Sequence, residues 1–266
     1  MNIQIKTLKE NEIWSVINAN SVPKDSNILS GRWVFTEKEQ EIGPKIQKAR
    51  WVIREFKQKD EDINFDKLTA STVKAQTTRI LFALTAENSW DIQQINTIAA
   101  FLNKEVKDDV FVKLSVRYRQ KDKICKLKKA LYDLRTSPAI WHETQTAFLR
   151  GLDYSQASYN SALYSRRLLN GVVYISSHVN DYIITGSDNQ GIRKLKEIMS
   201  SRFKIKDIGA CKTYLDMEIA REKQAIRLTQ AKFTTHLLQD AGLWDAKPKP
   251  TLMKAGLKIE PANVPI

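Results

Sequence analysis

The amino-acid sequence predicts an α+β fold, in which a sheet of mostly antiparallel strands has helices on one side. Three observations support this prediction. Residues 172–186 hold two runs rich in Val, Ile and Tyr, joined by the polar pair Asn180-Asp181, which is the pattern of a β-hairpin. Stretches with the helical spacing of apolar residues precede and follow this hairpin. The chain has 266 residues, 42% of them hydrophobic, so it can bury a substantial core.

The N-terminal half is expected to alternate strands and helices. In order, we expect a short helix running into a strand across 8–17, strands at 32–35 and 48–54, a helix at 74–89, a strand at 90–96 and a short helix from residue 99. The helix at 74–89 rests on Ile80, Ala83 and Leu84, which stand at i, i+3 and i+4. These three side chains should therefore form its buried face.

The C-terminal half adds three helices and two strands. Ser137-Pro138 predicts a helix start, because serine can cap free amides and proline is tolerated in the first turn. Asp188 should cap a second helix, whose apolar residues keep the helical period: Ile192, Leu195, Met199 and Phe203. Strands are expected at 213–219 and 225–228, and Thr229 should open a last helix that ends at Gly242. The tail beyond Pro248 is expected to be loosely held.

The charge balance favours a polyanionic partner. The chain carries 43 Lys and Arg against 30 Asp and Glu, a formal charge of +13, so nucleic acid is the first candidate, although many soluble proteins share such a balance. No apolar run is long enough to span a bilayer and the first residues lack a signal-peptide core, so we expect an intracellular protein, cytoplasmic or nuclear. Cys125 and Cys211 lie in unlike contexts and are expected to be reduced thiols.

Two stretches could contact phosphates. In residues 48–54, strand alternation places basic side chains opposite a packed face; the basic set is Lys48, Arg50 and Arg54, and the packed set is Ala49, Trp51 and Ile53. This pattern fits an edge strand with protective charges as well as a phosphate-contacting surface. A second stretch interleaves apolar residues with five lysines, namely Lys121, Lys123, Lys126, Lys128 and Lys129. It fits a solvated face and a phosphate-contacting face equally well.

Several separated segments resemble, in the right order, the reverse transcriptase of copia-type retrotransposons. They cover roughly residues 8–251, and an ordered series of this kind is more specific than any single motif. The segments are Trp14-Ser15-Val16, Arg32-Trp33-Val34-Phe35, Lys48-Ala49-Arg50-Trp51-Val52, Phe65-Asp66, Ala70-Ser71, Gln94-Ile95-Asn96, Ala100-Phe101-Leu102-Asn103, Cys125-Lys126-Leu127, Ala130-Leu131-Tyr132, Ser137-Pro138, His178-Val179-Asn180-Asp181, Phe203-Lys204-Ile205-Lys206-Asp207-Ile208-Gly209, Tyr214-Leu215 and Leu228-Thr229-Gln230.

The resemblance implies a right-hand polymerase fold, with a palm of antiparallel strands backed by helices, fingers and the start of a thumb. It implies one reverse transcriptase-like domain over residues 1–250, followed by a tail at 251–266. The implied subdomains are fingers at about 28–75 and 106–130, palm at about 76–105 and 131–222, and thumb start at about 223–250. An RNA template and a DNA primer are the implied partners, with Mg²⁺ as cofactor. No membrane is implied, and the sequence carries no indication of an oligomeric state.

Carried over position by position, the resemblance also implies a site. Asn96 stands where the family has its first catalytic aspartate, and Asn180 and Asp181 stand at the aspartate pair of its Y-V-D-D type motif. Lys48 and Arg50 would lie near the phosphates of the incoming nucleotide. The implied nucleic-acid contacts are Arg54, Lys121, Lys123, Lys126, Lys128 and Lys129. The helix after Ser137-Pro138 would help to seat template and nucleotide, and Tyr214-Leu215 would lie near the primer grip.

The departures from the family pattern predict a degenerate, inactive copy. Nucleotide addition needs two Mg²⁺ ions about 4 Å apart, and carboxylates must neutralise and position both. Asparagine keeps the shape of aspartate but loses its charge, so only Asp181 of three carboxylates is retained and Mg²⁺ binding is expected to be weak or lost. If each lost carboxylate raised the barrier by about 3–4 kcal/mol, the rate would fall on the order of 10⁴-fold or more.

Other departures fall where the family usually has glycine. These positions are Glu55, Lys104, Asp133 and Asp216, and each adds a charged side chain where backbone freedom is expected. Asp-to-Asn, Gly-to-Asp and Gly-to-Glu replacements can each arise from one guanine-to-adenine change. Three hypotheses follow: an inactive relic of a reverse transcriptase, a non-catalytic nucleic-acid-binding protein derived from a retrotransposon, and an active polymerase with an altered metal site.

Overall fold

The computed structural model describes residues 2–38, 43–54, 70–100, 105–106, 109–115, 118–131, 134 and 136–248. The chain divides into two compact units, one formed by residues 1–211 and 222–226 and the other by residues 212–221 and 227–266. The predictions for Glu55, Lys104, Asp133, the helix beyond residue 100 and the tail at 251–266 lie outside the described residues. None of the helices in the described ranges has the length and hydrophobicity of a membrane span.

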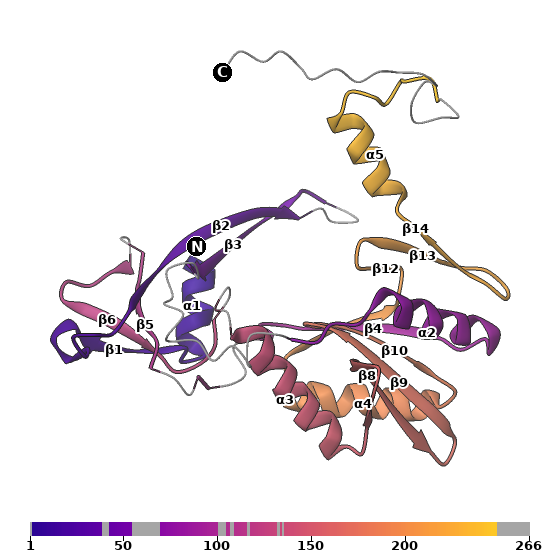
Figure 1. The fold of residues 1–266 in the computed structure, drawn as a ribbon, viewed down its shortest axis with the longest axis horizontal. Helices are drawn as coiled ribbons and strands as arrows, with labels where there is room; N and C mark the ends of the chain where they lie inside the picture. Colours follow the sequence, from indigo (N-terminus) through magenta and orange to yellow (C-terminus); the bar gives the residue numbers. More distant parts are fainter. Residues whose placement is uncertain are drawn as a thin grey trace. The chain divides into compact units, whose positions relative to one another are not determined.

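The first sheet of the larger unit is built from N-terminal strands and from strands within residues 111–127 (Figure 1). Its order is β1-β6-β5-β2-β3, in which β2 and β5 run parallel and the other neighbours are antiparallel. The elements are α1 (Asn2–Glu10), β1 (Trp14–Asn18), the 3-10 turn η1 (Ala19–Ser21), β2 (Ile28–Lys38), β3 (Ile46–Ile53), β5 (Phe111–Lys113) and β6 (Lys123–Leu127). The helix at the N-terminus and the strands at 32–35 and 48–54 are therefore confirmed.

The core of this part centres on Trp51, which is fully buried. Trp14 meets the Trp51 ring edge-on at 6.4 Å between ring centroids, and Leu8 and Ile13 are buried in the same cluster. Gly31 lies opposite Ile53 in the β2–β3 pairing, beside the indole of Trp51. A Cβ atom placed on Gly31 would come within 2.3 Å of that ring, so the close approach of strand and indole requires glycine.

The second sheet has six strands, and every neighbouring pair is antiparallel. Its order is β11-β4-β10-β9-β8-β7. The strands are β4 (Ile92–Thr97), β7 (Ser155–Ala157), β8 (Asn160–Leu168), β9 (Gly171–His178), β10 (Asp181–Gly186) and β11 (Ile205–Ala210). The strand predicted at 90–96 and the hairpin at 172–186 are confirmed, whereas β5, β6, β7, β8 and β11 were not predicted.

Two helices cover one face of this sheet, namely α3 (Ser137–Gly151) and α4 (Asn189–Arg202). On the α3 side, Tyr182 donates its hydroxyl proton to Gln145 Oε1 at 2.7 Å, and burial raises the pKa of Tyr182, so the hydroxyl stays protonated and can donate. On the α4 side, Lys196 donates to Gln93 Oε1 at 2.8 Å. Asp188 caps α4 by accepting from the Gly191 amide at 2.8 Å, as predicted.

Helix α2 (Ala75–Glu87) covers the opposite face of the sheet, so the prediction that helices lie on one side was wrong. Thr85 of α2 and Thr185 of β10 share a hydrogen bond of 3.1 Å, and Thr185 alternates with the residues that face α3 and α4. Strand alternation therefore fixes α2 on the other face. The contact between Thr85 and Thr185 places α2 over the end of β10 that carries Thr185 and not over the end that carries Asp181.

The buried face of α2 also differs from the prediction. Ile80 is 61% exposed and Leu84 is 42% exposed, while the helix buries a different stripe: Thr78, Leu81, Phe82, Thr85 and Ala86. Two of these buried residues are threonines, whose hydroxyls donate to backbone carbonyls of the preceding turn. Because hydrogen bonds satisfy the threonines, a face that hydropathy alone rejects can be buried.

Local chemistry differs from prediction at the start of α3. Its N-cap residue is Thr136, which makes no side-chain capping bond, while Ser137 Oγ donates to the Leu131 carbonyl at 2.7 Å. Ser137 therefore ties the helix to the preceding segment and does not cap it. Pro138 lies in the first turn, as expected.

The smaller unit contains the sheet β12-β13-β14 and the helix α5 (Ala231–Asp240). The strand predicted at 213–219 is split into β12 (Thr213–Tyr214) and β13 (Met217–Arg221) by Leu215 and Asp216, whose φ values are +48° and +59°. Asp216 thus occupies the left-handed conformation that favours glycine. Thr229 belongs to β14 (Ile226–Thr229) and donates to Glu218 Oε2, so the N-cap of α5 is Gln230 and not the predicted Thr229.

We predict that Gly31→Ala destabilises the fold by about 1–3 kcal/mol, because the added methyl group must displace the fully buried indole of Trp51. Gly151→Ala is the matched control, since nothing lies within 4 Å of its added Cβ at the end of α3. The control should be neutral or slightly stabilising. Chemical denaturation of both variants measures the difference, and equal stabilities would show that Trp51 does not restrict this site.

Candidate active site

The β9–β10 hairpin contributes two of the candidate site residues, Asn180 and Asp181. His178 pairs with Asp181, so the two turn residues are Val179 and Asn180, and Asp181 is the first residue of β10. The predicted Asn180-Asp181 tip is thus corrected by one position. Val179 has a φ of +57°, and Trp141 Nε1 donates to its carbonyl at 2.7 Å, so α3 helps to hold the turn in this unusual conformation.

The register of β4 against β10 brings together Asn96, Asn180 and Asp181, the three positions that the resemblance assigns to catalytic aspartates. Asn96 lies directly opposite Asp181, and the amide of Thr97 donates to the Asn180 carbonyl at 2.8 Å. Positions from β4, from the hairpin turn and from β10 therefore converge at one point of the sheet. Their side chains lie on the face opposite α3 and α4, because Asn96 and Asp181 alternate with Ile95 and Tyr182, which are buried against those helices.

A chain of hydrogen bonds joins these three side chains, each of which is partly buried. The Asn180 side-chain amide donates to Asn96 Oδ1 at 3.1 Å. The Asn96 side-chain amide in turn donates to Asp181 Oδ1 at 2.5 Å. Each asparagine thus donates an N–H group to a side-chain oxygen that could otherwise face a cation.

Two further residues flank this group, and sequence reasoning did not single them out as site residues. Lys206 of β11 lies opposite Asn96 and is exposed, and His178 lies opposite Asp181 and is half-buried. The strand β11 was not predicted, so nothing in the residue pattern indicated that Lys206 would lie beside Asn96. His178 could have been found from the two-residue spacing of the hairpin.

The basic residues predicted from β3 keep their expected face. Lys48 and Arg50 lie opposite Thr36 and Val34, while Trp51 and Ile53 are buried in the core cluster. Arg54 follows the strand, and its backbone amide donates to the Ser30 carbonyl at 2.8 Å. The strand β3 is therefore packed on one face, while the other face carries Lys48 and Arg50 and, at its end, the buried Val52.

The lysines at 121–129 do not form one uniform basic face. Three of them contact their own chain: Lys123 donates to Asn18 Oδ1 at 2.6 Å, Lys126 pairs with Asp109 at 2.6 Å, and Lys129 donates to the Asn11 carbonyl at 2.8 Å. Lys121 and Lys128 are exposed. In the sheet order, β6 is separated from β3 by β5 and β2, so this run and the β3 cations lie on different parts of the sheet.

Comparison with known proteins identifies the family. The profile described as "Reverse transcriptase (RNA-dependent DNA polymerase)" matches residues 11–255, nearly the whole chain. The chain belongs to the reverse transcriptase family. Its fold is accordingly of the right-hand polymerase type, and β11-β4-β10-β9-β8-β7 is an antiparallel sheet backed by α3 and α4.

The reverse transcriptase domain is similar to transposon polyproteins. It is 27% identical over 272 residues to the retrovirus-related Pol polyprotein from transposon TNT 1-94 of Nicotiana tabacum, covering 100% of this chain and 20% of that protein. It is 27% identical over 263 residues to the Pol polyprotein from transposon RE1 of Arabidopsis thaliana, covering 97% of this chain and 18% of that protein. The chain thus spans about a fifth of these relatives and is a reverse transcriptase domain of copia-type transposon Pol.

Among solved structures, the reverse transcriptase domain is similar to a telomerase from Candida albicans in complex with a fragment of telomeric RNA. The TM-score is 0.45 at 6% sequence identity, and the match covers 86% of this chain and 49% of that chain.

The residues present do not fit the divalent metal that reverse transcriptases use. Magnesium prefers several oxygen ligands of negative charge, and here one carboxylate, Asp181, is hydrogen-bonded to an amide N–H group. Among the described residues, no group of three or more His, Cys, Asp or Glu side chains is placed to hold a metal ion. At positions 96 and 180 an amide supplies one neutral carbonyl oxygen in place of a charged carboxylate, so the attraction for a cation is weaker.

Restoring both aspartates should create a metal-dependent stability that the native chain lacks. Without Mg²⁺, the Asn96→Asp/Asn180→Asp variant should be less stable by about 1–3 kcal/mol, because three neighbouring carboxylates repel one another. Added Mg²⁺ should raise its melting temperature, since a ligand that binds only the folded state stabilises it.

Thermal unfolding of the native chain and the variant, with Mg²⁺ or EDTA, provides the measurement. The double change Gln76→Glu/Gln239→Glu, at exposed positions on α2 and α5, controls for the two added negative charges and should show no response to Mg²⁺. A native chain that gains as much stability from Mg²⁺ as the double variant would contradict the account.

Proposed function

We propose that this reverse transcriptase domain no longer polymerises nucleotides and retains the ability to bind nucleic acid. The observation that supports the first part is the hydrogen-bond chain from Asn180 through Asn96 to Asp181. In this chain the polar groups of the three side chains bond to one another. The group carries one negative charge, whereas two divalent cations would need three carboxylates. The loss in rate would be on the order of 10⁴-fold or more, from about 3–4 kcal/mol per missing carboxylate.

The second part of the proposal rests on the cations of the first sheet. Lys48 and Arg50 are assigned to the phosphates of a nucleotide, and Arg54 with the lysines at 121–129 to a nucleic-acid backbone. Within that run, Lys121 and Lys128 are the better candidates, because both are exposed while Lys126 is held by Asp109. A net charge of +13 favours an RNA template or DNA primer as the partner.

The subdomains are part of the same proposal. We assign fingers to about 28–75 and 106–130, palm to about 76–105 and 131–222, and the thumb start to about 223–250. In this arrangement α3 would help to seat the template, and Tyr214-Leu215 would lie near the primer grip. The alternative function is a nucleic-acid-binding protein derived from a retrotransposon, in which the same cations act without any polymerase role.

Primer extension tests the loss of catalysis. The native chain should not extend a DNA primer on an RNA template with Mg²⁺ or Mn²⁺, whereas Asn96→Asp/Asn180→Asp should extend it, because the missing negative charge is restored around Asp181. The double variant with Asp181→Asn added is the control and should again be inactive. Efficient extension by the native chain would refute the proposed defect.

Salt-titrated binding tests the retained function. Affinity for single-stranded RNA should fall steeply with salt, and Lys128→Met should lower the slope of log K against log salt by about 0.7, the value for one lost phosphate contact on a single strand. Lys126→Met should change the slope less, because Asp109 already pairs with that ammonium. Affinity that is weak and independent of salt would leave the inactive relic as the better description.

A further inference from the structure

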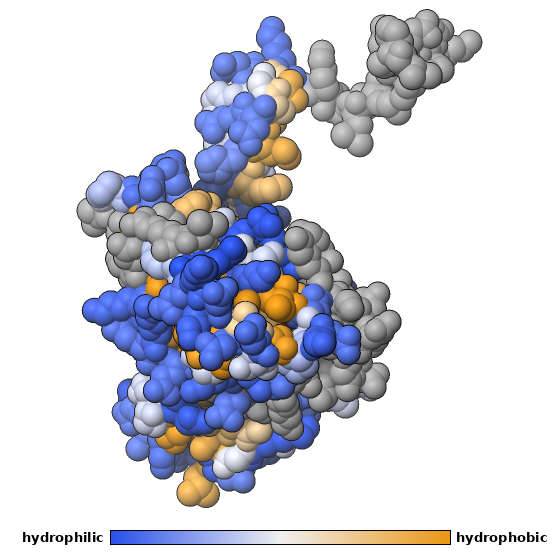
Figure 2. Space-filling model, turned by 90° about the vertical axis from the view of Figure 1, so that its left-hand side faces the viewer, coloured by the Kyte–Doolittle hydropathy of each residue, from blue (hydrophilic) through white to orange (hydrophobic). Residues whose placement is uncertain are grey.

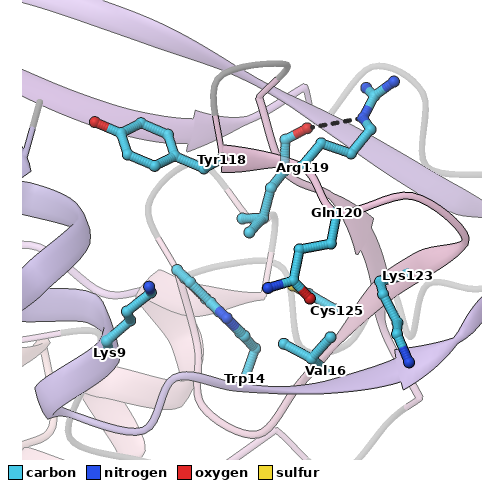
Figure 3. Close-up of a pocket in the computed structure, with 9 residues that line it drawn as sticks. Lys9, Trp14, Val16, Tyr118, Arg119, Gln120, Lys123 and Cys125 are labelled. Atoms are coloured by element: carbon cyan, nitrogen blue, oxygen red, sulfur yellow. Dashed lines mark hydrogen bonds between the residues drawn. The ribbon is translucent and has the colours of Figure 1, made fainter.

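A small cavity opens in the first sheet, away from the Asn180–Asn96–Asp181 group. It lies between the end of α1, strand β1, the segment after β5 and strand β6, and it has a volume of about 80 Å³ (Figure 3). Its apolar lining includes Trp14, Val16 and Leu114, and Cys125 also lines it. Figure 2 shows hydrophobic residues gathered among hydrophilic ones on the side of the molecule that carries β1 and β6.

The polar groups of the cavity are arranged in two sets. Figure 3 shows the Gln120 side-chain amide directed towards Trp14 and Val16, with the ammonium of Lys9 beside the indole. The guanidinium of Arg119 and the ammonium of Lys123 are directed away from this interior. Among the described residues that line the cavity there is no Asp or Glu, so its charged side chains are all cationic.

The Cys125 thiol does not add charge to the cavity. Burial raises the pKa of Cys125 to about 11, partly offset by the charge of Lys9, so the thiol is neutral at physiological pH. A neutral thiol packs as a small apolar group. The interior therefore offers an aromatic face, apolar walls, one amide that both donates and accepts, and one ammonium donor.

We propose that this cavity binds a single pyrimidine base that carries a phosphate. Sites for drug-sized ligands measure about 300–1,000 Å³, so about 80 Å³ suits one ring and excludes a whole nucleotide from the interior. The Trp14 indole can stack with the ring, as aromatic side chains do with unpaired bases. The Gln120 amide can pair with a donor and an acceptor on the base edge, and Lys9 can donate to a ring carbonyl.

The phosphate would remain outside the cavity, where the outward-directed guanidinium of Arg119 can meet it. Arg119 donates to the Leu114 carbonyl through Nε at 3.4 Å, which leaves its terminal nitrogens available for a phosphate. A free mononucleotide and one nucleotide of a single strand present the same chemistry. This subsite is separate from the nucleotide assigned to Lys48 and Arg50, because β1 and β3 are the opposite edges of the sheet. It does not depend on the proposed function.

Isothermal titration with uridine 5′-monophosphate tests the proposal, with ribose 5-phosphate as a probe that lacks the base. The nucleotide should bind and ribose 5-phosphate should bind at least about tenfold more weakly, since base contacts of this kind are worth about 1–3 kcal/mol. Gln120→Leu, which removes the pairing amide, and Val16→Phe, which fills the cavity, should each weaken binding about tenfold or more. Gln76→Leu, an exposed change on α2, should leave affinity within about twofold.

Photo-crosslinking locates the bound base. The 4-thio derivative of the nucleotide should label peptides that contain Trp14 or residues 118–125. Competition by a short oligouridylate identifies a single strand as the source of the nucleotide, and its absence identifies the free mononucleotide. Equal binding of ribose 5-phosphate, labelling elsewhere, or unchanged affinity in Gln120→Leu and Val16→Phe would each overturn the proposal. Circular dichroism must show that each variant is folded as the native chain is. The two substitutions lie on different segments, Val16 on β1 and Gln120 between β5 and β6, so a folding defect in one does not affect the test by the other.

Discussion

The antiparallel register between β4 and β10 is the constraint on which the site depends. Because Asn96 lies opposite Asp181, and the turn places Asn180 beside both, the side chains are forced into mutual contact whatever their chemistry. A shift of one residue would send every side chain of β10 to the other face. The buried Tyr182 and Ile184 oppose such a shift, since they pack against the cluster that α3 and α4 help to form.

Within this fixed geometry, the exchange of a carboxylate for an amide reverses the local electrostatics. Three aspartates at these positions would repel one another and would be stabilised by cations. An asparagine keeps one oxygen but adds an N–H donor, so the group can satisfy itself internally. The group then needs no cation to offset repulsion among three carboxylates. In the proposed account, the loss of catalysis and the hydrogen bonding within this group follow from the same change of carboxylate to amide.

The parts of the fold that the sequence predicted best are those with local chemical signatures. The hairpin at 172–186 and the Asp188 cap follow from β-rich runs and from a side chain that satisfies free helix amides. The buried face of α2 could not be predicted from hydropathy, because Thr85 is buried through hydrogen bonds to Leu81 and Thr185 that depend on the tertiary structure. The split of 213–219 was missed because Leu215 is not a usual turn former, and Asp216 alone is a weak turn signal within a run of strand-forming residues.

The same distinction applies to the site. The family motif placed 96, 180 and 181 together, yet neither the hydrogen bonds among them nor the neighbouring Lys206 can be deduced without β11 and the strand register. Likewise, equal weights for the lysines at 121–129 reflected their spacing alone, whereas Asp109 and Asn18 hold two of them in the folded chain. Sequence spacing indicates which face a side chain occupies, and only tertiary packing decides which partner it meets.

The central claim is that the side-chain amides of Asn96 and Asn180 stand where carboxylates would bind a metal ion. Paramagnetic broadening by Mn²⁺ tests it most directly, with the side-chain amide protons of Asn96 and Asn180 observed by nuclear magnetic resonance in the native chain. The account predicts that millimolar Mn²⁺ leaves these signals no broader than those of exposed asparagines such as Asn88. Selective loss of the Asn96 and Asn180 signals at low Mn²⁺ would contradict it.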